Sequence, residues 1–276
     1  MEIILGKFAG FCPGVKRAWS LVEKAARKKK GSIYILGELI HNKQAIEQLK
    51  KWGVKKITDP REIKGGETIV IRAHGESPET YQKLKKLKLP VIDATCPWVA
   101  RVQKLAPKLE EKGFRVIICG EKNHPETKAI IGYTKNGRVI SSIGEAKRVP
   151  WVEKIGVLSQ TTFSNYLFKE ICQILKKKTK EFESVGTICS FTQLAQKEAR
   201  KIAKMVDIVF VVGGRQSSNT KRLAELTRKI VSTFHIETEK EIKKDWLKGV
   251  RRVGLLAGAS TPDWIIKKVK KRLEGF

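Results

Sequence analysis

The chain has 276 residues, of which 41% are hydrophobic, and its formal net charge is +29. A chain of this length buries roughly three quarters of the surface that its unfolded form exposes, so its core needs no disulfide. No apolar run approaches the ~18 residues of a membrane helix, and the start does not resemble a secretory signal, so we expect a cytoplasmic protein outside the membrane.

The excess of lysine and arginine raises the question of nucleic-acid binding, because clustered cations release counterions from phosphate backbones. The cations are instead spread over segments such as 82–88 and 265–273, where they alternate with apolar residues at helical spacing. No zinc-finger spacing, basic zipper or aromatic RNA-binding signature accompanies them. We therefore expect no nucleic-acid partner and keep a basic nucleic-acid-binding protein as an alternative.

Three of the five cysteines mark an internal repeat. Cys12, Cys96 and Cys189 each follow a short apolar or β-branched segment and precede a pattern typical of an amphipathic helix. The expected helices cover residues 13–28, 97–112 and 190–205. Each thiol is therefore expected at a strand-to-helix turn, with a proline at the first helical position after Cys12 and Cys96.

Each third of the chain then offers two further strands that end in polar loops. The first strands and their loops are 32–42, 114–126 and 208–220, and they bring His41, His124 and Ser217 about 28 residues after the cysteines. The second are 68–77, 154–164 and 251–262, which end near His74, Thr161 and Ser260. Alternating strands and helices favour parallel sheets with right-handed crossovers.

Residues 190–276 do not contain a final strand for the last third. The apolar N-terminal segment EIILG can supply it. We therefore predict an α/β protein, a pseudo-threefold trefoil of similar lobes, each a small mostly parallel sheet with flanking helices. The predicted lobes are residues 13–96, residues 97–189, and residues 190–276 completed by 1–12. Because parallel sheets present ligands at the carboxyl ends of their strands, the loops are expected to line one central cavity.

The repeated cysteines predict a metal centre. A thiolate at a helix N-terminus is expected to have a lowered pKa and to bind a soft metal, which suggests zinc or an iron–sulfur cluster. Zinc sites usually contain a close pair such as C-x₂-C, which is absent, so a cluster fits better. Three cysteines leave one iron of a [4Fe–4S] cluster open as a Lewis acid. Cys119 and Cys172 are expected to be small core residues.

The loops also predict a phosphate site. The side chains of His41, His74, His124, Ser217, Ser218, Asn219 and Ser260 form a set of hydrogen-bond donors that suits a diphosphate. Glu126 and Glu76 are carboxylates of these loops, and Glu126 could donate a proton to a departing oxygen. His235 is read as structural.

The motifs GFCPGVKRA, GELIHN, RAHG, DATCPWV, NHPE, SQTT, TIC, SSNT and AGASTPDW, which run in order along the chain, resemble one family, 4-hydroxy-3-methylbut-2-enyl diphosphate reductase. The resemblance implies one [4Fe–4S] cluster on Cys12, Cys96 and Cys189. It also implies reductive removal of the allylic hydroxyl of (E)-4-hydroxy-3-methylbut-2-enyl diphosphate, bound at the open iron, with two electrons and two protons, giving isopentenyl and dimethylallyl diphosphates.

The resemblance further implies roles for the loop residues. Glu126 would supply protons, Thr161 would orient the oxygen and the acid, with Thr162 as the neighbouring candidate, and His124 would join the site. The diphosphate would be held by His41, His74, His124, Ser217, Ser218, Asn219 and Ser260. Two departures are an Arg-Gln pair missing after Cys189, which puts local packing there in doubt, and Gln216 in place of the usual Asn.

The resemblance also implies partners: the allylic diphosphate substrate and an electron donor such as ferredoxin or flavodoxin. We expect a monomer, because a closed ring of three lobes leaves no unpaired strand. A non-redox [4Fe–4S] dehydratase of a phosphorylated substrate remains an alternative, since it also binds a hydroxyl on an open iron but needs no external electrons.

Overall fold

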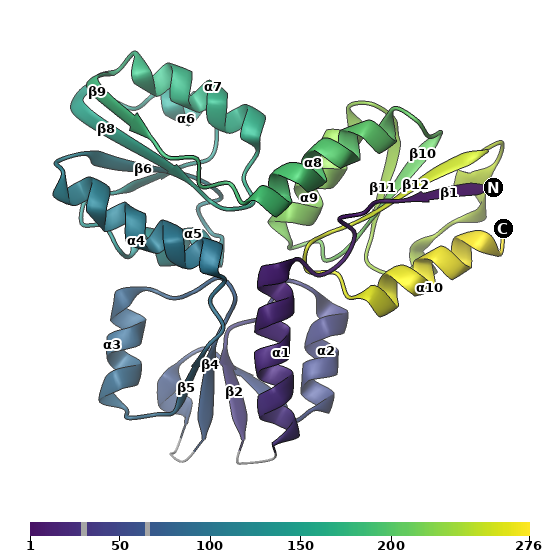
Figure 1. Ribbon diagram of the computed structural model, residues 1–276, viewed down its shortest axis with the longest axis horizontal. Helices are drawn as coiled ribbons and strands as arrows, with labels where there is room; N and C mark the ends of the chain where they lie inside the picture. The colour runs from purple at the N-terminus through teal and green to yellow at the C-terminus, as the bar shows by residue number, and fades with distance from the viewer. Residues whose placement is uncertain (29–31, 64–66) are drawn as a thin grey trace. The chain divides into compact units, whose positions relative to one another are not determined.

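The strands form three parallel sheets, each of four strands, in the computed structural model, which describes residues 1–28, 32–63 and 67–276 (Figure 1). The strand orders are β3-β2-β4-β5, β7-β6-β8-β9 and β11-β10-β12-β1, the last one read from its far edge. The three orders are equivalent, with β1 in the position that β5 and β9 take in the other sheets. The predicted α/β class and its internal repeat are therefore confirmed.

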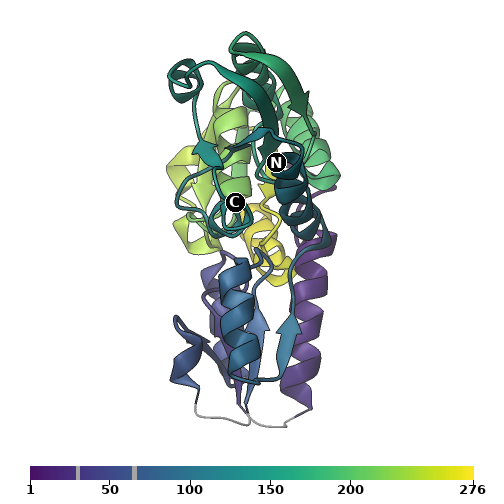
Figure 2. The same ribbon diagram turned by 90° about the vertical axis from the view of Figure 1, so that its left-hand side faces the viewer.

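The first sheet holds the strands β2, β3, β4 and β5, and Figure 2 shows α3 lying beside these strands. Its strands are β2 (Ile33–Leu36), β3 (Val54–Ile57), β4 (Thr68–Ile71) and β5 (Val91–Asp93). The neighbouring helices along the chain are α1 (Pro13–Arg27), α2 (Lys43–Lys51), the short 3₁₀ helix η1 (Pro60–Glu62) and α3 (Pro78–Lys86). Leu84 of α3 packs with Ile69 and Ile71 of β4 in one buried cluster.

The second sheet is covered on both faces. Its strands are β6 (Arg115–Cys119), β7 (Arg138–Ile140), β8 (Val152–Ser159) and β9 (Thr179–Ser184), and its helices are α4 (Pro97–Glu111), α5 (Pro125–Ile131), α6 (Ile143–Lys147) and α7 (Asn165–Lys176). Val116 and Ile118 pack with α4 and α5, whereas Ile117 and Cys119 pack with α6 and α7. This alternation follows from side chains that point to opposite faces along a strand.

The third sheet contains both terminal strands of the fold. Its strands are β1 (Glu2–Leu5), β10 (Ile208–Val212), β11 (Ser232–Ile236) and β12 (Arg252–Ala257), with α8 (Ser190–Ala203), α9 (Ser218–Arg228), α10 (Asp263–Glu274) and the 3₁₀ helices η2 (Glu239–Glu241) and η3 (Lys244–Leu247). β1 pairs in parallel with β12, from Glu2 opposite Arg252 to Leu5 opposite Leu255. Clusters on the two faces of the sheet include α8 and α9 on one side and α10 on the other.

The helices begin where their sequences predict. Ser77, Ser164 and Ser217 each accept a backbone N–H from the first turn of the following helix, which satisfies a donor that the helix itself leaves unpaired. Pro97 occupies the first turn of α4, as expected. None of the helices in the described part of the chain combines the length and the apolar character needed to cross a membrane.

Contacts along the chain group its residues into two compact units. The first comprises Met1–Lys16, Ile40–Lys51 and Ser190–Phe276, and contains the third sheet. The second comprises Arg17–Leu39 and Trp52–Cys189, and contains the other two sheets. The predicted division into lobes at residues 13–96, 97–189 and 190–276 with 1–12 remains our proposal.

The aromatic core of the third sheet yields a stability prediction. Phe210 of β10 is fully buried and stacks on Phe234 at a ring-centroid distance of 5.6 Å. We expect Phe210→Ala to lower the free energy of unfolding by about 3–5 kcal/mol, because it leaves a cavity between rings that cannot fully collapse. Met205→Ala, at a side chain that is 45% exposed, should cost under about 1 kcal/mol. Urea denaturation of both variants measures the difference, and equal losses would contradict it.

Candidate active site

Each of the three cysteines of the repeat is held by the same backbone hydrogen bond. The cysteine N–H donates to the carbonyl oxygen of the second residue after a central strand of its own sheet. The pairs are Cys12 with Ala259 after β12 (3.1 Å), Cys96 with Ala73 after β4 (3.0 Å) and Cys189 with Thr161 after β8 (3.0 Å). The cysteines therefore occupy equivalent positions at the carboxyl ends of their sheets.

Cys96 is the N-cap residue of α4, and the backbone N–H groups of Trp98 and Val99 lie near its sulfur. Burial nevertheless raises the pKa of the Cys96 thiol above its usual value, the N–H groups oppose this, and the negative charges of Glu126 and Cys189 raise it further. The expectation of a lowered pKa is wrong for this cysteine, because burial outweighs the effect of the helix N-terminus. These charge effects also show that Glu126 and Cys189 lie near Cys96.

Glu126 is a buried carboxylate held by a single partner residue. One of its oxygens accepts the backbone N–H of Thr161 (2.6 Å) and the other accepts the Thr161 hydroxyl (3.0 Å). Only 2% of Glu126 is exposed. Burial raises its pKa to about 7, even though both hydrogen bonds from Thr161 lower it. At neutral pH this carboxyl is therefore close to half protonated, as a general acid requires.

The two candidate threonines make different contacts. The Thr161 hydroxyl binds Glu126, whereas the Thr162 hydroxyl accepts the side-chain N–H of Gln160 at 3.0 Å. Gln160 in turn accepts the backbone N–H of Glu121 at 3.0 Å. The geometry thus favours Thr161 over Thr162 as the residue that acts with Glu126.

Two histidines adjoin this pair. His124 is the N-cap of α5, and its Nδ1 accepts the backbone N–H of Glu126 at 3.2 Å, which leaves Nε2 as the protonated nitrogen of the neutral ring. The His124 ring lies edge-on to that of His74, with centroids 5.1 Å apart. Gly75 follows with φ +72°, and a Cβ there would collide with the Gln103 amide of α4, so glycine is needed to fit this loop against the helix.

These contacts join six predicted site residues of the second unit in one network. Cys189 binds Thr161, Thr161 binds Glu126, and the Glu126 backbone binds His124. His124 contacts His74, and Ala73 next to it binds Cys96. Two thiols, a carboxylic acid and two imidazoles thus lie together at the carboxyl ends of strands from the first and second sheets.

The first unit assembles a second set of predicted residues. Ser260 Oγ donates to the His41 carbonyl oxygen at 3.3 Å and lies 3.5 Å from Ser217 Oγ. The same carbonyl approaches Gly214, where a Cβ would collide with it, which explains a glycine in the GGRQSSN loop. His235 Nε2 donates to the Gly213 carbonyl oxygen at 2.9 Å, so His235 supports this loop, consistent with its structural interpretation.

Buried polar atoms at the start of α9 lack partners. Both side-chain amide atoms of Asn219 are buried, and neither has a hydrogen-bond partner among the described residues. Ser218, beside it, is also buried. Asn42 Nδ2 is a further buried donor without a partner in the described ranges. The sequence reasoning missed Asn42, although its place directly after His41 in GELIHN could have indicated it. Because such groups are costly unless paired, a bound polar ligand would satisfy them.

The segment that leads to Cys12 is fixed by α8. The Glu198 carboxylate accepts the backbone N–H groups of Lys7 (2.9 Å) and Phe8 (3.2 Å). Phe191, near the position of the missing arginine, packs edge-on against the Phe8 ring at 5.4 Å. An aromatic contact therefore stabilises the helix start where the departure put packing in doubt.

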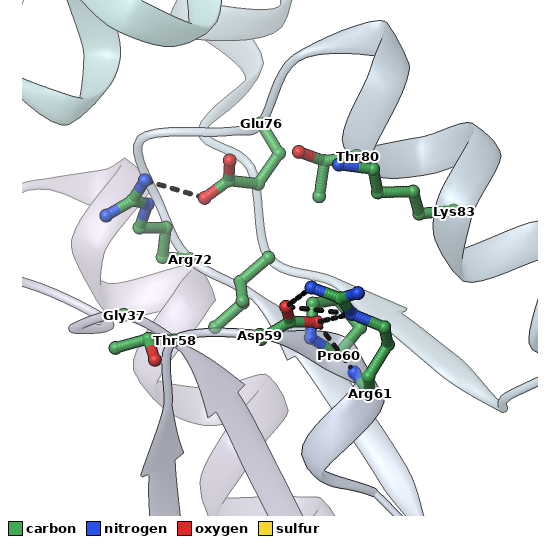
Figure 3. Close-up of a pocket in the computed structure, with 10 residues that line it drawn as sticks. Gly37, Thr58, Asp59, Pro60, Arg61, Arg72, Glu76, Thr80 and Lys83 are labelled. Atoms are coloured by element: carbon green, nitrogen blue, oxygen red, sulfur yellow. Dashed lines mark hydrogen bonds and ion pairs between the residues drawn. The ribbon is translucent and has the colours of Figure 1, made fainter.

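Glu76, the other carboxylate of the predicted loops, faces a different pocket (Figure 3). It forms a largely buried ion pair with Arg72 at 2.7 Å. The pocket has a volume of about 330 Å³ and lies at the carboxyl ends of β2, β3 and β4, where Asp59 and Arg61 also line it. Burial raises the pKa of Glu76 too, and the Arg72 guanidinium opposes this rise, so we interpret Glu76 as a structural partner of Arg72.

The two remaining cysteines behave as core residues. Cys119 of β6 is fully buried, and burial raises its pKa well above the usual value. Cys172 of α7 is partly buried and packs against the same hydrophobic cluster. Burial raises the pKa of Cys172 to about 11. Both side chains therefore pack as small apolar residues, as expected.

Comparison with known proteins identifies relatives over the whole chain. The family model described as LytB protein matches residues 3–274. The 4-hydroxy-3-methylbut-2-enyl diphosphate reductase of Aquifex aeolicus is 42% identical over 282 residues, covering 99% of this chain and 96% of the relative. The reductase of the same name from Geobacter sulfurreducens is 41% identical over 278 residues, covering 100% and 98%.

Solved structures agree with these relatives. A structure of (E)-4-hydroxy-3-methyl-but-2-enyl diphosphate reductase, described as the terminal enzyme of the non-mevalonate pathway, matches with a TM-score of 0.73 and 41% identity over the whole of both chains. The E-1-hydroxy-2-methyl-but-2-enyl-4-diphosphate reductase of Plasmodium falciparum matches with a TM-score of 0.93 and 30% identity, covering 98% of this chain and 87% of that one. The predicted trefoil of three α/β lobes fits this likeness.

The raised pKa of Glu126 predicts a pH-dependent stability. Its pKa is about 7 in the fold against a usual 4.5, so the protonated acid is favoured in the folded chain. The fold is therefore penalised as pH rises from about 4.5, and the full cost of about 3 kcal/mol is reached above about 7. For the metal-free protein, we expect the stability of the wild type relative to Glu126→Gln to fall by about 2–3 kcal/mol between pH 5 and pH 8. Denaturation curves at several pH values test this, and a constant difference would refute it.

Proposed function

Because the chain belongs to the LytB family, we propose that it reduces (E)-4-hydroxy-3-methylbut-2-enyl diphosphate. Membership of this family makes the chain an enzyme, an oxidoreductase. In the proposed reaction the allylic C–O bond breaks, a C–H bond forms, and the hydroxyl leaves as water. Two electrons and two protons balance the change, and the products are isopentenyl and dimethylallyl diphosphates.

We propose that Cys12, Cys96 and Cys189 hold one [4Fe–4S] cluster. None of the five cysteines forms a disulfide within the described residues. Each of these three, at the start of a helix, donates its backbone N–H to a carbonyl oxygen beyond a central strand. Cys189 lies near Cys96, and the backbone N–H groups near the Cys96 sulfur favour its thiolate form, which suits a cluster held by thiolates. When bound, such a cluster supplies electron transfer and a Lewis-acidic iron.

The buried Glu126–Thr161 pair is the observation that carries the proposal. A carboxylic acid with a pKa of about 7 lies beside two cysteines of the repeat and holds a proton that it can give to a leaving hydroxyl. Thr161 orients both oxygens of this acid, and His124 binds the backbone of Glu126 and presents Nε2–H as a further donor. In this proposal Glu126 donates the proton, and Thr161 and His124 position the acid and the substrate.

The diphosphate would be bound by His41, His74, His124, Ser217, Ser218, Asn219 and Ser260, with Thr162 as a secondary candidate. The support lies in the buried, unpartnered amide of Asn219 and in the clustering of Ser217, Ser260 and His41. Phosphate oxygens would accept a hydrogen bond from the buried Asn219 amide, which has no partner among the described residues. The start of α9 adds a helix N-terminus, which favours an anion.

The reaction needs an external electron donor such as ferredoxin or flavodoxin. We place the enzyme in the cytoplasm, where thiols stay reduced, and expect a monomer. A non-redox dehydratase would use a similar site without reductant, so a requirement for reductant separates the two functions. The network around Glu126 gives a nucleic-acid role no support.

The first test combines cluster content with chemistry. We expect anaerobically purified protein to contain about four irons and four sulfides per chain. With dithionite it should convert the hydroxymethylbutenyl diphosphate to both isoprenoid diphosphates. Cys96→Ser should lose the brown absorbance of the cluster, whereas the matched control Cys172→Ser, a core thiol, should keep it. Equal retention in the two variants would exclude Cys96 as a ligand, and turnover without reductant would favour the dehydratase.

Glu126→Gln separates proton delivery from binding. The amide keeps the shape and can still pair with Thr161, so we expect the Kd for the substrate to change by less than about three-fold. Turnover should fall by about a hundred-fold or more, because the side chain no longer carries an acidic proton. In the wild type, kcat should fall as pH rises above about 7, where Glu126 loses its proton.

Glu153→Gln, at an exposed carboxylate of β8, is the matched control and should leave both values unchanged. Calorimetry with the substrate and single-turnover rates measure the two quantities. Near-normal turnover of Glu126→Gln would remove this residue from the proposed mechanism.

A further inference from the structure

The exposed face of α4 begins beside a proposed cluster ligand. Cys96 is the N-cap of this helix, and Trp98 two residues later is 38% exposed. Arg101, Lys104 and Lys108 follow at helical spacing, and all three are exposed. One aromatic ring and three cations thus form a continuous strip that leads away from Cys96.

The cations of this strip are not neutralised by neighbouring acids. Within the described residues Arg101, Lys104 and Lys108 form no ion pair, whereas Lys83 of α3 pairs with Glu79 and Arg222 of α9 pairs with Glu225. The two acids of α4 are its last residues, Glu110 and Glu111, at the end opposite Cys96.

A further cation lies at the Cys96 end of the strip. Arg17 is exposed, and its guanidinium donates to the carbonyl oxygens of Thr95 (3.1 Å) and Asp93 (3.4 Å). These bonds fix a positive charge one residue from Cys96. The surface around Cys96 is therefore basic, and hydrogen bonds hold one of its cations, Arg17, in place.

Trp98 connects the Cys96 sulfur with the protein surface. Its backbone N–H lies near the Cys96 sulfur, and its indole ring is exposed with the Arg101 guanidinium 5.8 Å from the ring centroid. Cys96, a proposed cluster ligand, is thus only two residues along the chain from an aromatic ring that is exposed to solvent. Tryptophan and arginine are also the residues most enriched in the energetically dominant parts of protein interfaces.

We propose that Trp98, Arg101, Lys104 and Lys108, with Arg17, form the docking surface for a small acidic electron-carrier protein. This inference rests on the proposed function, because only a reductase needs two electrons per turnover. Two one-electron carriers would deliver them in succession and leave oxidised. Electron-transfer complexes are small and transient, and complementary charge accelerates their formation. A carrier with an acidic face fits a strip of unpaired cations and an exposed ring.

The test reverses the charge of the strip. In the holoenzyme, Arg101→Glu/Lys104→Glu/Lys108→Glu should raise the KM for a reduced acidic ferredoxin at least about ten-fold at low salt. It should leave the dithionite-driven rate unchanged, because that small reductant needs no docking surface. The Kd for oxidised ferredoxin, measured by surface plasmon resonance, should rise equally and provides a readout independent of turnover. The salt dependence of wild-type binding should weaken in the variant.

Lys267→Glu/Lys268→Glu/Lys271→Glu on the exposed face of α10 is the matched control, since it changes the net charge by the same amount. It should alter KM and Kd by less than about two-fold. Equal effects of the two triple variants would overturn the proposed surface and leave only a general effect of charge. Absence of dithionite-driven turnover in the wild type would instead refute the proposed function. If the α4 variant loses its cluster, Lys104→Glu and Lys108→Glu are tested singly, and unchanged affinities would refute the surface.

Discussion

The hydrogen bond from each cysteine N–H to the strand end beside it is the constraint on which the site depends. A parallel sheet leaves the carbonyl groups beyond a central strand available, and the residue that starts the next helix is placed to bind one of them. Cys96 thus sits beside Ala73, and Cys189 beside Thr161. Because the acceptor residues adjoin His74 and Glu126, a single backbone contact fixes both a thiol and its acid–base neighbours.

Burial then raises the pKa values of these groups. Glu126 keeps its proton near neutral pH because the loss of water outweighs two hydrogen bonds from Thr161. Burial also raises the pKa of Glu76, but the group that opposes this rise is the charged Arg72 guanidinium, whereas Glu126 has only the hydrogen bonds from Thr161. Asn219 is left with a buried amide that the described chain does not satisfy. A buried polar group without a hydrogen-bond partner needs an explanation, and a bound ligand would supply that partner.

The repeat could be predicted from the sequence because each cysteine, strand end and helix start recurs with the same residue types. The edge strands β3, β7 and β11 were missed, since they are short and partly polar, as in VKKI of β3. The raised pKa of Cys96 was also unpredictable, because it depends on burial by segments distant in sequence. The choice between Thr161 and Thr162 likewise needed the structure, since adjacent residues of a loop face different partners.

The pairing of β1 with β12 has a consequence for how the protein is made. Cys12 leaves the ribosome long before Ala259, the residue whose carbonyl oxygen accepts its backbone N–H. During synthesis the third sheet must wait for β12, which emerges roughly 250 residues after β1, before its edge strand can dock. Cys12 therefore cannot reach its final position until Ala259 has been synthesised. Binding of the proposed cluster would have to follow the synthesis of β12 and of the loop after it.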